Sequence, residues 1–231
     1  MTKHSPATYG LLGMLATRPW TGYELAQQVR RSMRFIWPVS EGHLYREQKK
    51  LVSLGWATVT DIEAGRRTRK RYEITEAGRY ALAEWLRSEP EEPHLQIEGL
   101  LRTLYADHAG SDELVTALIT TAEQAATMVA DLGEFAREYL ADGGPLEMLE
   151  SGLSGPDAEL RDFRGRPMYP TRLHAVAVAL DMTSQILVAV EKACGNAASD
   201  VKHWESTTAA ELTPETRVRL ERVAQLTSHQ G

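Results

Sequence analysis

The sequence predicts a mostly α-helical protein with two domains, the first of which contains a short β-hairpin. Three observations lead to this fold class. Up to residue 88 the apolar residues recur at helical spacing, except in a stretch rich in β-branched and aromatic residues at 56–74. An acidic, proline-rich segment, 89–93, then marks a boundary, and beyond it the periodicity is helical throughout. We therefore expect domains at residues 1–90 and 91–231.

Three helices of the first domain are predicted from their capping residues. Ser5, followed by a proline, has the pattern of an N-cap and opens a helix that runs to about residue 17. Thr21 and Glu24 have the spacing of a capping box and open the second helix. Ser40 caps the third helix, which ends at a glycine, residue 55. The side chains expected to be buried are Tyr9, Leu11, Leu12, Leu15, Ala16, Tyr23, Leu25, Ala26, Val29, Leu44, Leu51 and Leu54.

A β-hairpin and a fourth helix complete the predicted first domain. The strands are expected at 56–62 and 71–75, with a turn at Ala64 and Gly65. Thr75 then caps a helix with Tyr80, Ala81, Leu82, Trp85 and Leu86 available for packing. The predicted tip of the hairpin coincides with five cations in six positions: Arg66, Arg67, Arg69, Lys70 and Arg71.

The second domain is predicted to be entirely helical. A short helix at 95–108 is followed by long helices at 111–141 and 171–194, and a weakly amphipathic helix begins after residue 213. Residues 143–169, dense in Gly and Pro, are expected to be loop-like. Apolar positions on the long helices alternate by four and three, the spacing of helices that pack along their length. We expect these positions to form a homodimer interface: Leu114, Leu118, Met128, Leu132, Val176, Leu180, Leu187 and Val190.

Charge is divided unevenly between the two domains. Residues 1–88 hold 15 Lys and Arg against 8 Asp and Glu, a charge of +7, so the remainder carries −13 within a total of −6. This asymmetry favours a first domain that faces a polyanion and a second domain that is kept away from it. Chance enrichment in arginine is the alternative explanation.

The composition predicts a soluble protein of a reducing cytosol. Hydrophobic residues make up 42% of the chain and charged residues 25%, which is ordinary for a globular protein. No uninterrupted apolar run approaches the roughly 20 residues that span a bilayer, and the first residues lack a signal-peptide pattern. A single cysteine cannot form an internal disulfide. We therefore expect a cytoplasmic location and no membrane partner.

Signs of catalysis are weak throughout the sequence. The seven histidines are scattered, and none stands at metal-ligand spacing with a cysteine or a carboxylate. Cys194 lies among apolar residues, which is more typical of a core side chain than of a nucleophile. No glycine-rich phosphate loop is present. We expect no catalytic residues, no metal and no cofactor.

Two stretches of the first domain resemble the PadR family of bacterial transcriptional regulators. They are "SEGHLYREQKKLVSLGWATV" and "RKRYEITEAGRYAL", and the resemblance covers residues 5–88. It implies a winged helix-turn-helix fold, in which the hairpin is the wing. One departure is Gln48, which stands where the family usually has an apolar residue. The residues that match the family pattern, besides the basic wing, are Gly42, Leu44, Tyr45, Leu51, Gly55, Tyr72, Ile74, Thr75 and Gly78.

The resemblance implies that the third helix enters the major groove of DNA. Its first residues are then nearest to the base edges, and Arg46 could read a guanine through two hydrogen bonds. Tyr45 suits a phosphate, with half-buried packing as the alternative, while His43 could simply be an exposed helix residue. The cations of the wing are expected to contact the DNA backbone or a minor groove. The implied contacts outside the wing are Ser40, His43, Tyr45, Arg46, Lys49 and Lys50.

The sequence as a whole predicts a DNA-binding transcriptional regulator. By resemblance it is a homodimeric repressor, bound to a roughly palindromic site in double-stranded DNA and released by a small-molecule effector. A winged-helix module that binds proteins is the alternative. That role would favour an apolar or acidic outer face on the third helix, whereas this face is basic. An enzyme domain in the second half ranks last.

Overall fold

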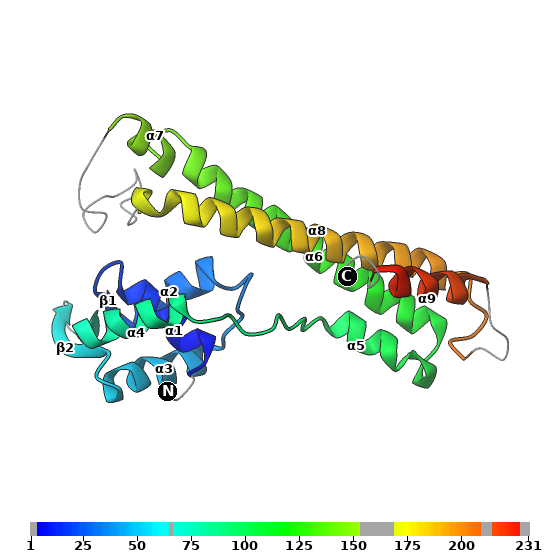
Figure 1. Cartoon of the computed structure of the whole chain (residues 1–231), viewed down its shortest axis with the longest axis horizontal. Helices are drawn as coiled ribbons and strands as arrows, with labels where there is room; N and C mark the ends of the chain where they lie inside the picture. Colours follow the sequence, from blue (N-terminus) through cyan, green and yellow to red (C-terminus); the bar gives the residue numbers. More distant parts are fainter. Residues whose placement is uncertain (1–3, 65–66, 153–168, 209–213, 227–231) are drawn as a thin grey trace. The chain divides into compact units, whose positions relative to one another are not determined.

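The computed structural model describes residues 4–64, 67–152, 169–208 and 214–226 (Figure 1). The chain divides into two compact units. Unit 1 combines residues 1–93 with 131–184, and unit 2 combines residues 94–130 with 185–231. Two long helices therefore contribute a stretch to each unit.

Unit 1 begins with a domain of four helices and a small antiparallel sheet (Figure 1). The helices surround a core of leucine, valine and aromatic side chains. In chain order the elements are α1 (Pro6–Leu15), β1 (Trp20–Thr21), α2 (Gly22–Ser32), α3 (Glu41–Ser53), β2 (Ala57–Ala64), β3 (Arg67–Ile74) and α4 (Glu76–Arg87).

The predicted helix caps are confirmed. Thr21 and Glu24 form a complete capping box, in which each side chain accepts a hydrogen bond from the backbone amide of the other. Ser40 accepts a hydrogen bond from a backbone amide of α3, and Thr75 does the same for α4. Gly55 ends α3 with a φ of +71°, a conformation that favours glycine. These local signals depend only on neighbouring residues, which is why the sequence identified them.

The sheet differs from the predicted hairpin in two ways. It has three strands in the order β1-β3-β2, because Trp20 and Thr21 pair with β3. Moreover, β2 and β3 are eight residues each, so the wing is longer than predicted. Arg67 begins β3, and the cations after it lie along this strand instead of at the tip. Arg66 lies outside the described residues. The strands are longer because β2 and β3 pair residue by residue beyond the stretches of high β propensity, from Ala57 opposite Ile74 to Ala64 opposite Arg67.

Most of the predicted core is confirmed, but some aromatic and leucine side chains are not buried. Tyr23, Tyr80, Trp85 and Leu86 are exposed, although Trp85 stacks on Tyr9. On α4 the reason is a close approach at Gly78, where a Cβ atom would lie 2.1 Å from the Trp56 carbonyl oxygen. This approach turns Gly78 and Ala81 inward and leaves Tyr80 on the opposite face.

The remaining elements are helical, as predicted. In chain order they are α5 (Glu98–Leu104), a 3₁₀ turn (Ala106–His108), α6 (Ser111–Leu140), α7 (Pro145–Glu150), a 3₁₀ turn (Pro170–Arg172), α8 (Leu173–Val201) and α9 (Pro214–Leu226). The short helix α7 was not predicted, because glycines and prolines surround it. Helix α8 extends to Val201, beyond the predicted end at Cys194, since Cys194, Ala198 and Val201 all pack in the core of unit 2.

Helix α8 alone, among the described residues, is long and apolar enough to cross a membrane. The expectation that no uninterrupted apolar run approaches about 20 residues is not contradicted, because polar residues interrupt this helix. Length and composition are weak indications by themselves, because core helices of soluble proteins also meet them.

Candidate functional site

The predicted contact residues of α3 all lie outside the core. Leu44 and Leu51 hold the opposite face of the helix in the core. Tyr45 is 39% exposed, which favours a surface contact over the alternative of core packing. The predicted contacts that are exposed or half-buried on α3 and its N-cap are Ser40, His43, Tyr45, Arg46, Lys49 and Lys50.

A buried carboxylate behind this face was missed in the sequence. Glu47 is only 6% exposed. Its Oε2 accepts a hydrogen bond from the Thr8 hydroxyl at 2.5 Å and lies 3.5 Å from Nζ of Lys50. Its Oε1 lies 3.6 Å from Nε2 of His43. The sequence spacing, four after His43 and three before Lys50, was the available signal, because such residues are neighbours on a helix surface.

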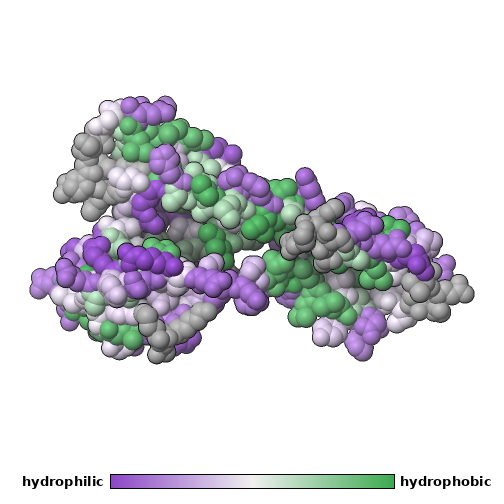
Figure 2. Space-filling model, viewed as in Figure 1, coloured by the Kyte–Doolittle hydropathy of each residue, from purple (hydrophilic) through white to green (hydrophobic). Residues whose placement is uncertain are grey.

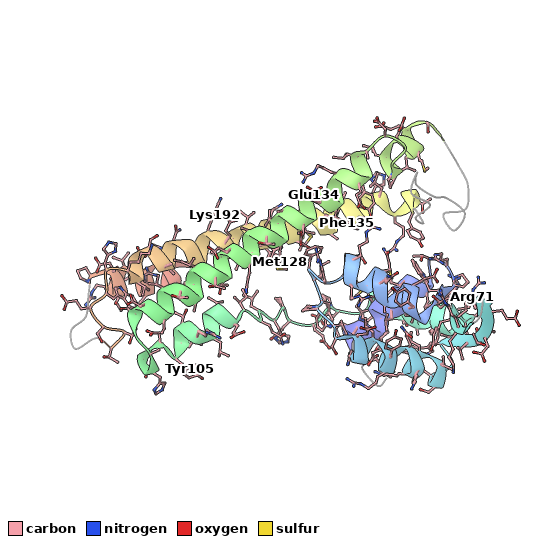
Figure 3. The ribbon with its side chains drawn as sticks, turned by 180° about the vertical axis from the view of Figure 1, so that it is seen from behind. Arg71, Tyr105, Met128, Glu134, Phe135 and Lys192 are labelled. Carbon is pink, nitrogen blue, oxygen red and sulfur yellow. The ribbon has the colours of Figure 1, made fainter. Side chains whose placement is uncertain are left out.

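The wing cations lie along β3. Successive side chains of a strand point to opposite faces, and Tyr72 is buried. Arg69 and Arg71 therefore lie on the face opposite Tyr72, and both are exposed, as is Lys70. Figure 3 shows Arg71 on the sheet, at the surface of the domain. The wing thus presents charge on both of its faces.

One carboxylate balances part of the charge of the wing. Burial raises the pKa of Glu24, but hydrogen bonds from the Thr21 amide and hydroxyl and nearby cations, including Arg69, lower it below its ordinary value. In contrast, Lys70 and Arg71 form no ion pair within the described part of the chain. These two are the described wing cations that are best placed to meet a phosphate.

The departure at Gln48 has a local structural consequence. Gln48 is 1% exposed, and its Nε2 donates a hydrogen bond to the Gly22 carbonyl oxygen at 3.2 Å. Its Oε1 is buried without a hydrogen-bond partner. The side chain thus links α3 to the start of α2 at the cost of one unpaired acceptor.

Unit 1 also contains a cavity of about 680 Å³. Its lining combines α1, the segment after α2, α4, and the unit 1 stretches of α6 and α8. Tyr9 and Trp85 stack beside it with ring centroids 4.9 Å apart. Burial raises the pKa of Tyr139 in the lining, although nearby Arg31 and Arg172 offset part of this effect. The cavity therefore offers aromatic surface, a phenol that stays protonated and a cation.

Two ion pairs connect the end of α2 and the segment after it to α6 within unit 1. Arg31 pairs with Glu138 and places its guanidinium 5.3 Å from the centre of the Phe135 ring. Arg34 pairs with Asp131 at 2.6 Å. Because Phe135 also lines the cavity, the Arg31–Glu138 pair lies next to the cavity lining.

The residues predicted to form a dimer interface contribute mainly to the packing of the chain itself. Leu114, Leu118 and Leu132 are buried within a single chain and present no surface to a second copy. The other five are half-buried. The exposed apolar residues of α8 instead follow a neighbouring stripe, because this helix is apolar on more than one side. They are Val178, Met182 and Ile186, each between 54% and 60% exposed.

Further apolar side chains are exposed in unit 2. Leu101 and Leu104 on α5 and Tyr105 just after it are exposed. Figure 2 shows hydrophobic residues gathered over this helix. Helix α9 likewise exposes Val218 and Leu220. Contiguous exposed apolar surface is typical of an interaction site.

The described residues contain no cluster of His, Cys, Asp and Glu that could hold a metal ion. Cys194 is buried, and burial raises the pKa of its thiol. A buried thiol of this kind is a poor nucleophile.

Comparison with known proteins identifies the first domain. Residues 11–84 match the model of the transcriptional regulator PadR-like family. A probable transcriptional regulator of Mycobacterium tuberculosis is 31% identical over 86 residues, which are 37% of this chain and 45% of that protein. The negative transcriptional regulator PadR of Bacillus subtilis is 23% identical over 151 residues, or 64% of this chain and 80% of that protein.

Solved structures extend the likeness of fold beyond that domain. The crystal structure of Bacillus subtilis PadR in complex with operator DNA matches 84% of this chain and 98% of its own, with a TM-score of 0.60 at 17% identity. The crystal structure of the same protein in complex with p-coumaric acid matches 85% and 98%, with a TM-score of 0.55 at 19% identity. Both share the winged helix fold followed by a helical region.

Proposed function

We propose that this chain, which belongs to the PadR-like family of transcriptional regulators through residues 11–84, is a homodimeric repressor that an effector releases from DNA. The observation that carries the proposal is the pair of exposed basic elements on one winged helix domain. The polar face of α3 and the strand β3 each present cations to solvent. Duplex DNA has the charge and the groove dimensions to receive both elements.

The two elements take different roles on DNA. The start of α3 enters the major groove, where Arg46 reads base edges and Tyr45 and Lys49 contact the backbone. Lys70 and Arg71 of the wing contact phosphates or a minor groove. An apolar or acidic α3 face would instead suit a protein partner.

Dimerisation places two recognition helices on one operator. A second copy covers the exposed stripe of α8, formed by Val178, Met182 and Ile186, because removing such apolar side chains from water is favourable. A two-fold dimer binds half-sites about one helical turn apart, which makes the operator roughly palindromic. Because the protein acts on DNA, we place it in the cytoplasm.

The cavity of unit 1 is the proposed effector site. Its volume suits a small molecule, and its aromatic lining and Arg172 suit a ligand with an apolar body and one polar group. We infer repression and release by an effector from a relative. The Bacillus subtilis protein is a negative transcriptional regulator, and its structures have been solved in complex with operator DNA and with p-coumaric acid. Such a ligand must bind the released conformation more tightly than the DNA-bound one.

Selection from a pool of random duplexes tests DNA recognition. Repeated capture by the full chain should enrich a roughly palindromic sequence. If the folded protein enriched no sequence from the pool, this result would contradict sequence-specific binding.

Sedimentation tests the dimer surface. The double variant Val178→Asp, Met182→Asp should sediment as a folded monomer at micromolar concentration, where the wild type is a dimer. The control, Tyr80→Asp, changes an exposed side chain of α4 and should stay dimeric. A double variant that remains dimeric would place the interface elsewhere.

A further inference from the structure

We infer that Glu47 is a positioning residue that withholds the charge of Lys50 from DNA and so limits sequence-independent binding. This inference rests on the proposed DNA-binding function. It changes the sequence-based expectation that Lys50 contacts DNA, while Lys49 keeps that role.

The first step is the geometry around Lys50. Its Nζ lies 3.2 Å from the Thr8 hydroxyl oxygen and 3.5 Å from Oε2 of Glu47. The side chain thus turns back toward α1, away from the exposed face of α3. Lys49, the neighbouring residue, is exposed and forms no ion pair within the described part of the chain.

The second step is the burial of the carboxylate. Because Glu47 is 6% exposed, water cannot replace a lost partner without a rearrangement. A buried carboxylate is costly unless it is paired and hydrogen-bonded. Thr8 donates a hydrogen bond to it, and His43 contributes a full charge only when it is protonated. Lys50 is therefore the permanent cation of this group, and its departure to a phosphate would leave the buried charge without one.

The third step is the consequence for DNA binding. Each phosphate that a protein neutralises contributes about −0.9 to the slope of log affinity against log salt. Because Glu47 holds Lys50, Lys50 should contribute little to this slope. A sequence-specific regulator benefits, since phosphate contacts strengthen binding to every sequence alike.

The test measures the binding of the full chain to a random-sequence 30-base-pair duplex by fluorescence anisotropy across salt concentrations. Glu47→Gln removes the carboxylate charge and should release Lys50. The slope should become steeper by about 0.9, and affinity at 0.1 M salt should rise about eightfold. The double variant Glu47→Gln, Lys50→Gln should return to the wild-type slope. A purely structural role of Glu47 would instead weaken binding and lower the melting temperature without a steeper slope.

A second comparison does not depend on changing Glu47. In the otherwise wild-type chain, Lys49→Gln should flatten the slope by about 0.9, and Lys50→Gln should flatten it far less. Equal flattening by the two variants would overturn the inference, as would an unchanged slope in a folded Glu47→Gln protein. If the wild type itself fails to bind duplex DNA, the proposed function fails first.

Discussion

Two substitutions on the wing and one on α3 should weaken DNA binding in different ways. Replacing Lys70 and Arg71 with glutamine removes two exposed wing cations, neither of which forms an ion pair within the described residues. The double variant keeps the strand, because both replaced side chains are exposed and the buried Tyr72 is unchanged.

The structure sets the size of the effect. Two phosphate contacts at about 0.9 each flatten the salt slope by about 1.8. Between 0.05 and 0.2 M salt the wild type should therefore lose about twelvefold more affinity than the double variant. Adding Arg69→Gln should change the slope by clearly less than another 0.9, because Glu24 already balances part of the charge of Arg69.

The assay compares a selected operator with a random duplex in the same salt series. The wing variant should weaken both duplexes alike. Arg46→Gln should instead cost about 1–3 kcal/mol on the operator and little on the random duplex, if Arg46 reads a guanine. Melting temperatures should stay within a few degrees of the wild type. A folded wing variant with the wild-type salt slope would refute the assignment of the wing to phosphate contact.

Three further predictions concern stability. Gln48→Leu should raise the free energy of unfolding in urea by about 1 kcal/mol, because the unpaired Oε1 costs more than the hydrogen bond to Gly22 contributes; a loss would contradict this. Leu118→Ala should lower that free energy by about 3 kcal/mol by leaving a cavity in unit 2, and a loss below 1 kcal/mol would argue against the packing. Because the pKa of Tyr139 is raised in the folded state, its contribution to stability should be lost as pH rises above about 10, and Tyr139→Phe should make the alkaline decline in melting temperature shallower; an unchanged decline would contradict the burial.

The sequence by itself determined the helices, their caps and the basic first domain. Thr21 with Glu24, Ser40 and Thr75 act on backbone amides only three residues away, so their signals are complete within a short window. Helical periodicity likewise identified α6 and most of α8. The charge asymmetry and the family pattern on α3 pointed to DNA, because both are properties of residue order alone.

The tertiary structure decided which face of each element is buried and which charged side chains are exposed to solvent. Strand β1 forms because Trp20 pairs with Tyr72 of β3, which is 52 positions away in the chain. Glu47 takes its hydrogen bond from Thr8 on α1, so the spacing of His43, Glu47 and Lys50 could not by itself show that this carboxylate is buried. Likewise, Leu114 and Leu118 pack against Cys194 and its neighbours within one chain, which moves the candidate dimer surface to another stripe of α8. Each of these outcomes depends on contacts between residues far apart in sequence, and such contacts form only when the chain has folded.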